Sequence, residues 1–480
     1  MGLSAALEIG KTGLKIYQVA TEVVSENVAN VNTPGYSRQR VILETAPPST
    51  ANGFPLGTGV KIATVERYYD ALLQKQLVNA GTTSGYDSKK SDVLQQIEPT
   101  FNEVAQDGLG AAISDFYSSW QDLSLNPTGA SERQAVLSKA QIMVDQFHNV
   151  SDTLNDAMVA QNESLPSQLD SINTTLENIA QLNSQIRSTE LVSGNANEMR
   201  DQRDYLVRQL AGSMAINYTE NSDGTTSVNY SDSTGSYSLI DPYGIPPAAT
   251  FAAVAKGTLL PDGTTPRYDV QIAAAGGRNT AIIAPVTGEL GATIVARDVT
   301  LQGYLDQVNT LANTMINGDG TSNGINAQHQ AGFDVSGAAG LAFFTVTAGS
   351  EAASIALNTN LTASKIAASG SATVAGDNSN AVLLAQLQNK TYSTLGNASV
   401  SNGYNALVSQ VGVDVNSAKS TASNDDAFLK QLTTLRDSNS GVSLDEELTD
   451  LIKYQRSYQA SAKLISTASD MMDTVINMIR

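Results

Sequence analysis

The stretch Ser25–Arg40 reads SENVANVNTPGYSRQR, and it marks the point where the chain changes from helical to extended character. Apolar residues at helical spacing run into it from the N-terminal side. Pro34 disfavours the helical conformation at Thr33, and the pair Pro34-Gly35 suits the centre of a type II turn. The sequence therefore predicts a helix that ends here and an extended segment, YSRQRVILET, that follows it.

The helix before this turn and the last segment of the chain carry the same apolar pattern. Apolar residues alternate at spacings of four and three, which is typical of a coiled-coil seam. The seam positions are Leu3, Leu7, Gly10, Leu14, Tyr17, Thr21, Val24, Val28 and Val31, and Leu444, Leu448, Leu451, Gln455, Tyr458, Ala462, Ile465, Ser469, Met472, Ile476 and Ile479. A further apolar row consists of Ile9, Ile16 and Val23 in the first segment and Leu464, Ala468, Met471, Val475 and Met478 in the last.

Two ordinary amphipathic helices on a globular core are the alternative interpretation of these patterns. The second apolar row favours several neighbours over one, and we expect these neighbours to be copies of the chain or related subunits. Gly10 and Gly13 lie inside the first helix, and each costs about 1 kcal/mol relative to Ala. We therefore predict that both ends are poorly ordered in the isolated monomer and fold on assembly.

Composition excludes several classes of function. A length of 480 residues suggests about three domains. The net charge of −19 disfavours binding to nucleic acid. The chain has no cysteine, which removes disulfides, thiol nucleophiles and thiolate metal sites. No apolar run approaches the length of a membrane span. The N-terminal segment also lacks the features of a cleaved signal peptide, so we expect the protein to stay inside or to leave by another route.

The middle of the chain alternates between helical and β-rich composition. Helical patterns begin at Ser131, with a kink or restart expected near Pro166, and return over Leu301–Asn317. The intervening segments are rich in Ser, Thr, Gly and Tyr and predict strands and turns. We therefore predict a mainly α fold with an inserted β-rich domain and a nested arrangement of the two ends. The expected domains are 1–35 with 441–480 (terminal, coiled-coil-like), 36–216 with 288–330 and 378–440 (helical), and 217–287 with about 331–377 (outer, β-rich).

Candidate metal and catalytic residues do not form a convincing site. The segment Asn317–Gln330 has the alternating ligands of a calcium loop, but Gln330 stands where a bidentate Glu is needed. His148 is expected on a helix surface, and His329 is expected in a polar turn.

Asp201 and Asp204 lie among arginines, which favours ion pairs on a helix surface over acid–base chemistry. We expect no enzymatic activity, no cofactor and no metal.

At both ends the residues resemble a known family. ENVANVNTPGYSRQR resembles the N-terminal signature of bacterial flagellar rod, hook and hook-associated proteins, and GVSLDEELTDLIKYQRSYQASAKLISTASDMMDTVINM resembles their C-terminal segment. The continuation Gly35-Tyr36-Ser37-Arg38-Gln39 is similar to the hook-associated protein 1 family of junction proteins, as are the internal stretches DQRDYL, NAQHQAGFDVSGAAGLAFF and GDNSNAVLLAQLQ.

The resemblance implies a ring of subunits in the axial tube of the bacterial flagellum, as an adaptor between hook and filament. It implies secretion without a cleaved signal, unfolded, through the flagellar type III export apparatus, and leaves open an external or a periplasmic flagellum. The implied partners are copies of the chain, the flagellar hook protein, the second junction protein (hook-associated protein 3) and a cytoplasmic export chaperone. Binding to nucleic acid and insertion into a membrane are not expected.

Together these observations predict two binding surfaces. The predicted axial assembly interface comprises Leu3, Leu7, Leu14, Tyr17, Val24, Asn27, Val28, Asn30, Thr33, Pro34, Gly35, Tyr36, Leu444, Leu448, Leu451, Tyr458, Ala462, Ile465, Met472, Ile476 and Ile479. The predicted export chaperone site comprises Leu464, Ala468, Met471, Val475 and Met478. Two alternatives stay open: another axial protein, such as a hook or rod subunit, and a secreted adhesin or hydrolase that uses residues 217–377.

Overall fold

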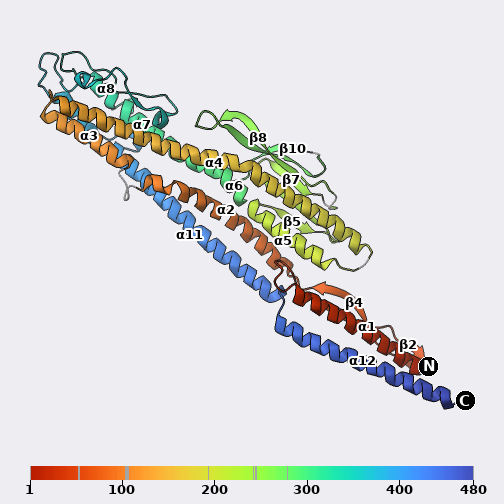
Figure 1. Ribbon diagram of the computed structural model, residues 1–480. Coiled ribbons are helices and arrows are strands. Elements are labelled where there is room, and N and C mark those ends of the chain that lie inside the picture. Colours follow the sequence, from red (N-terminus) through yellow and green to blue (C-terminus); the bar gives the residue numbers. More distant parts are fainter. Residues whose placement is uncertain are drawn as a thin grey trace.

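The computed structural model describes residues 2–51, 54–102, 108–192, 194–241, 243, 246–277 and 279–478. The molecule is elongated, and long helices run along its length (Figure 1). The two ends of the chain lie together at one end of the molecule, so the first and last helices form a unit of their own. The predicted fold class, mainly α with inserted antiparallel sheets and nested ends, is confirmed.

The terminal pair consists of α1 (Gly2–Ala29) and α12 (Leu444–Met478), which pack along each other. The helices approach closely at Gly10, where an added Cβ would lie 2.6 Å from Cγ1 of Ile465. At Gly13 an added Cβ would lie 2.8 Å from Oγ of Ser461. The two glycines that weaken an isolated α1 therefore permit its close contact with α12.

A long hairpin follows α1 and returns along it. Strand β1 (Gln39–Thr45) pairs antiparallel with β4 (Val60–Arg67), with Gln39 opposite Arg67 and Thr45 opposite Val60. Between them β2 (Ser49–Ala51) pairs with β3 (Phe54–Leu56). The extended segment predicted after the Pro34-Gly35 turn is therefore the first strand of this hairpin.

The helical body contains most of the remaining chain. Its main helices are α2 (Ala71–Phe101), α3 (Leu109–Leu125), α4 (Ala130–Glu190), α5 (Asn197–Ser213), α6 (Gly288–Val295), α7 (Gln302–Asn317) and α11 (Val400–Ser440). Shorter elements are α8 (Ile325–Gln330), α9 (Glu351–Ser354), α10 (Ser379–Gln386), the π-helical turn η2 (Ala296–Leu301) and the 3-10 turns η1 (Ala275–Gly277), η3 (Ala363–Lys365), η4 (Leu387–Asn389) and η5 (Ser393–Leu395).

Helix α4 spans 61 residues and continues through Pro166, so of the two alternatives predicted there, a kink or a restart, the restart is wrong. A proline inside a helix costs about 3 kcal/mol. Leu165 and Leu169 on either side are buried to within 1 %, and burial of each such side chain contributes about 1.5–3 kcal/mol. Burial of the apolar face of α4 on both sides of Pro166 offsets the defect.

Two three-stranded antiparallel sheets pack along the C-terminal half of α4. One has the order β5-β6-β7 and the other the order β10-β9-β8. The strands are β5 (Asn217–Glu220), β6 (Thr226–Asp232), β7 (Gly235–Ile240), β8 (Thr250–Leu259), β9 (Pro266–Ala273) and β10 (Thr280–Ile283). Their inward residues share one hydrophobic cluster with the C-terminal half of α4 and with α5.

The segment 331–377 does not join these sheets, although the sequence analysis grouped it with 217–287. It holds only short strands, β11 (Phe344–Thr345) and β12 (Ala356–Leu357), among the described residues. Phe343, Ile355 and Ile366 are completely buried in a second cluster with α3 and the N-terminal half of α4. The apolar residues of this segment are covered by helices, so it extends the far end of the helical body.

His329 lies in the middle of that second cluster, and its predicted position in a polar turn is wrong. Its ring is completely buried, with ring centroids 6.1 Å from Trp120 and 5.2 Å from Phe343. Nδ1 lies 2.6 Å from the carbonyl oxygen of Leu341, and Nε2 accepts a hydrogen bond of 2.9 Å from the amide of Ala367. Burial lowers the pKa of His329 to about 4.

The other polar candidates serve local structure. His148 is half-buried, with Nε2 at 2.8 Å from the carbonyl oxygen of Ile355. The carboxylate of Asp319 accepts hydrogen bonds from the amides of Thr321, Ser322 and Ser393, so it closes the loop whose spacing is similar to that of a calcium site. The described residues contain no cluster of three or more Asp, Glu or His side chains that could hold a metal ion. No helix among them has the length and apolar character needed to cross a membrane.

Candidate assembly interface

Residues 30–38, which connect α1 to β1, and residues 440–443, which connect α11 to α12, meet where the terminal pair joins the helical body. We call this region the joint. The amide of Arg38 donates a hydrogen bond of 2.7 Å to the carbonyl oxygen of Ser440. Nη2 of Arg436 donates to the carbonyl oxygens of Gly35 and of Tyr36, the latter at 2.7 Å. The Pro34-Gly35 turn is therefore held in place by Arg436 and Ser440, which follow it by about 400 positions in the chain.

Asn27 organises the interior of the joint. It is 1 % exposed, and its Nδ2 donates hydrogen bonds of 2.9 Å to the carbonyl oxygen of Gln39 and to Oε2 of Glu447. Its Oδ1 accepts hydrogen bonds of 2.9 Å from the hydroxyl of Tyr36 and from the amide of Gln39. A side-chain amide has two donors and two lone pairs, and all four are used here to join α1, β1 and α12.

Glu447 is a buried carboxylate at the start of α12, and Arg38 neutralises it. Its side chain is 1 % exposed, and Nε of Arg38 lies 2.5 Å from its Oε1. Arg38 also contacts Glu446, and its Nη2 lies 3.6 Å from Asp450. A buried carboxylate without its partner is strongly destabilising, so this ion pair fixes the start of α12 against β1.

Asp201 and Asp204 of α5 attach the joint to the helical body. Nη1 of Arg67 lies 2.7 Å from Asp201 and its Nη2 lies 2.8 Å from Asp204, with all three side chains buried. The amide of Ser37 donates a hydrogen bond of 2.7 Å to Asp201. The predicted position on a helix surface is wrong, because these ion pairs are buried and Arg67 comes from β4, although Arg203 of the same helix also lies 3.4 Å from Asp204. Burial raises the pKa of Asp201, against the opposing effect of Arg67.

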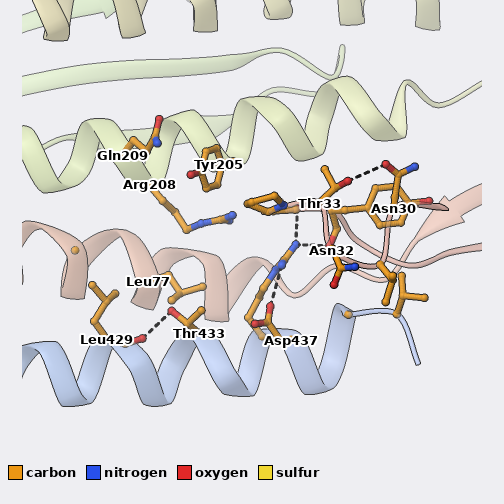
Figure 2. Close-up of a pocket in the computed structure, with 18 residues that line it drawn as sticks. Asn30, Asn32, Thr33, Leu77, Tyr205, Arg208, Gln209, Leu429, Thr433 and Asp437 are labelled. Atoms are coloured by element: carbon orange, nitrogen blue, oxygen red, sulfur yellow. Dashed lines mark hydrogen bonds and ion pairs between the residues drawn. The ribbon is translucent and has the colours of Figure 1, made fainter. Parts of the chain in front are cut away.

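A cleft of about 580 Å³ opens beside the joint (Figure 2). The cleft is lined by the turn at residues 30–36 and by three helices: α2, α5 with Tyr205 and Arg208, and α11 with Leu429 and Thr433. Gly35 has a φ of 83°, which favours glycine, and an added Cβ would lie 3.0 Å from Tyr205. The turn therefore packs against α5 at a distance that only glycine permits.

Some residues of the predicted axial assembly interface line this cleft, and the others lie elsewhere along the terminal pair. The turn residues that line it are Asn30, Thr33, Pro34, Gly35 and Tyr36. Sequence reasoning missed Arg208 and Arg436, because only the fold brings α5 and α11 to the turn.

The predicted seam residues of the terminal pair differ in exposure. Val24 is buried, and the half-buried positions are Leu3, Leu7, Leu14, Tyr17, Val28, Leu451, Ile465 and Met472. The exposed positions are Leu444, Leu448, Tyr458, Ala462 and Ile476. Ile479 lies outside the described residues. In the predicted chaperone row, Leu464, Met471, Val475 and Met478 are exposed, whereas Ala468 is 1 % exposed and is not accessible in this arrangement.

Comparison with known protein families gives three matches along the chain. The model described as "Flagellar hook-associated protein FlgK helical domain" matches residues 94–344, more than half of the chain. The C-terminal region of flagellar basal body rod FlgEFG proteins matches residues 436–478. The flagella basal body rod protein family matches residues 7–36. The latter two matches include the terminal helices and part of the joint.

Individual proteins are similar over nearly the whole chain. Flagellar hook-associated protein 1 of Bacillus subtilis is 29 % identical, over 98 % of this chain and 97 % of its own length. That of Escherichia coli is 26 % identical, over 99 % of this chain and all of its own length. The solved structure of the flagellar hook junction protein FlgK from Burkholderia pseudomallei has the same fold, with a TM-score of 0.64, 17 % identity and coverage of 77 % of this chain.

Proposed function

Because the chain belongs to the flagellar hook-associated protein 1 family, we propose that it is a structural adaptor that polymerises between the hook and the filament of the flagellum. The observation that carries the proposal is the uncovered apolar face of α12. Leu448, Ile452 and Ile476 are 49, 53 and 56 % exposed. Large exposed apolar side chains that recur along one helix often mark an interaction surface, and this face is available to other subunits.

Three partners are part of this proposal. Copies of the chain in a ring cover part of α12, and the hook protein and the second junction protein (hook-associated protein 3) cover the surfaces above and below that ring. Full burial of each large apolar side chain contributes about 1.5–3 kcal/mol. The predicted seam positions and the turn residues at the cleft are the contact residues of this assembly.

Export belongs to the same proposal. The chain passes unfolded through the flagellar type III apparatus without a cleaved signal and reaches the flagellum outside the cell. Before export, a cytoplasmic chaperone covers the exposed row Leu464, Met471, Val475 and Met478, which are 43, 47, 46 and 82 % exposed. The role is mechanical, and we assign no catalytic step to it: the buried charged groups at the joint are paired with one another or bound to backbone.

The test is deletion of the gene in its source bacterium, followed by electron microscopy of the cells and a blot of the medium for flagellin. Bare hooks with monomeric flagellin in the medium are the expected result, and the wild-type gene on a plasmid should restore filaments. Absence of hooks would assign the chain to the rod or hook instead. Intact filaments would contradict the proposal.

A further inference from the structure

Arg208 stands in the cleft with most of its hydrogen-bonding capacity unused by the described residues. Its Nη1 donates a hydrogen bond of 2.6 Å to Oε1 of Gln74, and its guanidinium lies 5.7 Å from the ring centre of Tyr205. A guanidinium has five N–H donors. The nearby carboxylates of Asp201 and Asp204 are engaged by Arg67. Burial, and after it the charge of Arg436, lowers the pKa of Arg208, although the charges of Asp204 and Asp201 oppose this effect.

The cleft as a whole is positive in a strongly negative protein. Arg208 and Arg436 line it together with one carboxylate, that of Asp437, whose Oδ1 lies 3.0 Å from Nη1 of Arg436. The net charge of the whole chain is −19. The walls also present Leu429 and Val442. Such a cleft would bind a surface that carries negative charge and some apolar side chains.

The first turns of α12 carry a surface of that kind. Leu444, Leu448 and Ile452 follow one another at intervals of four, so they lie along one face of the helix, and they are 46, 49 and 53 % exposed. Asp445 is exposed beside them. We call these four residues the ridge. Since they are exposed in the single chain, the ridge does not fill the cleft of its own molecule.

The ridge and the cleft adjoin along the molecule, on the two sides of the joint. Gly441 and Val442 line the cleft, and the ridge begins two residues later, where α12 leaves the joint. In a ring of parallel copies, each contact joins two different surfaces of neighbouring subunits. Copies that are displaced along the axis, as in a helical array, can bring two such adjoining surfaces together.

We propose that the ridge of one copy docks in the cleft of the next, with Asp445 facing Arg208. The contact is between copies of this chain, and it rests on the proposed function, which supplies the ring. It would couple the joint of one subunit to α12 of its neighbour.

The absence of cysteine in the chain makes a direct test possible. Gln209→Cys places a thiol at the cleft, and Thr449→Cys places one beside the ridge without removing Asp445. The two variants are produced together from separate genes in the deletion strain, and isolated flagella are oxidised and separated on a non-reducing gel. A disulfide-linked dimer of the chain should form. Thr321→Cys, exposed in the loop between α7 and α8, replaces Thr449→Cys as the matched control and should give no dimer.

A charge exchange tests the recognition itself. With both cysteines present, Asp445→Arg should lower the yield of dimer about tenfold, and adding Arg208→Asp should restore it. Asp445 is exposed, so its substitution leaves the fold intact. Dimer yield that is unchanged by Asp445→Arg, or crosslinks to another flagellar protein only, would overturn the proposal.

Failure of this inference is distinguishable from failure of the proposed function. Normal filaments without the dimer refute the docking of ridge and cleft and leave the junction role intact. Filaments that form in the uncomplemented deletion strain refute the junction role itself.

Discussion

Replacement of His329 by glutamine should make the stability of the helical body less dependent on pH. The folded state holds the imidazole neutral, since Nε2 accepts the amide of Ala367 and the ring is completely buried. Its pKa is lowered to about 4 in the folded state, whereas an exposed histidine in the unfolded chain titrates near 6.5. Between these values the unfolded state binds more protons, so the free energy of unfolding rises with pH.

The size of the effect follows from the two pKa values. This contribution is fully present above pH 6.5 and is lost as the pH falls toward 4. Between pH 7.5 and pH 5.5 the loss is about 1.3 kcal/mol, and its limit below pH 4 is about 3 kcal/mol. The side-chain amide introduced by His329→Gln does not titrate in this range, so the variant should lack this share of the pH dependence while other groups contribute equally to both proteins.

The assay uses the single tryptophan of the chain. Trp120 lies in the same cluster, with its ring centroid 6.1 Å from that of His329, so its fluorescence in urea reports the unfolding of this core. Both proteins are measured at pH 7.5 and at pH 5.5, and the difference between the two pH values is compared. The wild type should lose about 1.3 kcal/mol more than His329→Gln. Equal losses would refute the argument that the buried neutral ring is the cause.

Three further predictions concern the terminal pair. Asn27→Ala removes four buried hydrogen bonds, so it should destabilise the docked pair by about 2–4 kcal/mol; limited proteolysis of isolated flagella should cleave residues 30–40 faster than in the wild type, and equal rates would contradict this. Leu451→Asp should abolish incorporation into the junction and leave unfolding of the middle of the chain unchanged, with Gln459→Asp on the exposed side of α12 as control; normal incorporation would count against the seam. Amide exchange of α1 in a dilute monomer should be fast, and strong protection there would refute the prediction of folding on assembly.

Local patterns in the sequence suffice for the helices and the turn, because they depend on neighbouring residues. The end of α1 follows from Pro34 and Gly35, and the extended segment after it is β1. The long helices follow from apolar spacing, although the effect of Pro166 depends on how much of α4 is buried. In each of these cases the deciding interaction spans a few residues.

Partners that are distant in sequence explain what the sequence analysis missed. Asp201 looked like half of a surface ion pair until Arg67, 134 positions away, came beside it. His329 looked polar because its own neighbours are polar, whereas the ring is covered by Trp120 and Phe343 from elsewhere in the chain. Arg208 carried no signal at all, since its importance depends on a cleft made by four separate segments.

The long separation between the two ends also bears on when the terminal pair forms. Asn27 and Glu447 are hydrogen-bonded across 420 positions, and closing so long a loop has an entropic cost that local helices do not have. Contacts of this kind form late in folding. Until α12 arrives, α1 lacks its partner at Gly10 and Gly13, and the buried amide of Asn27 lacks Glu447. The joint therefore closes only on a complete chain, so the surface at residues 30–36 that the cleft presents to neighbours exists only after the last helix is in place.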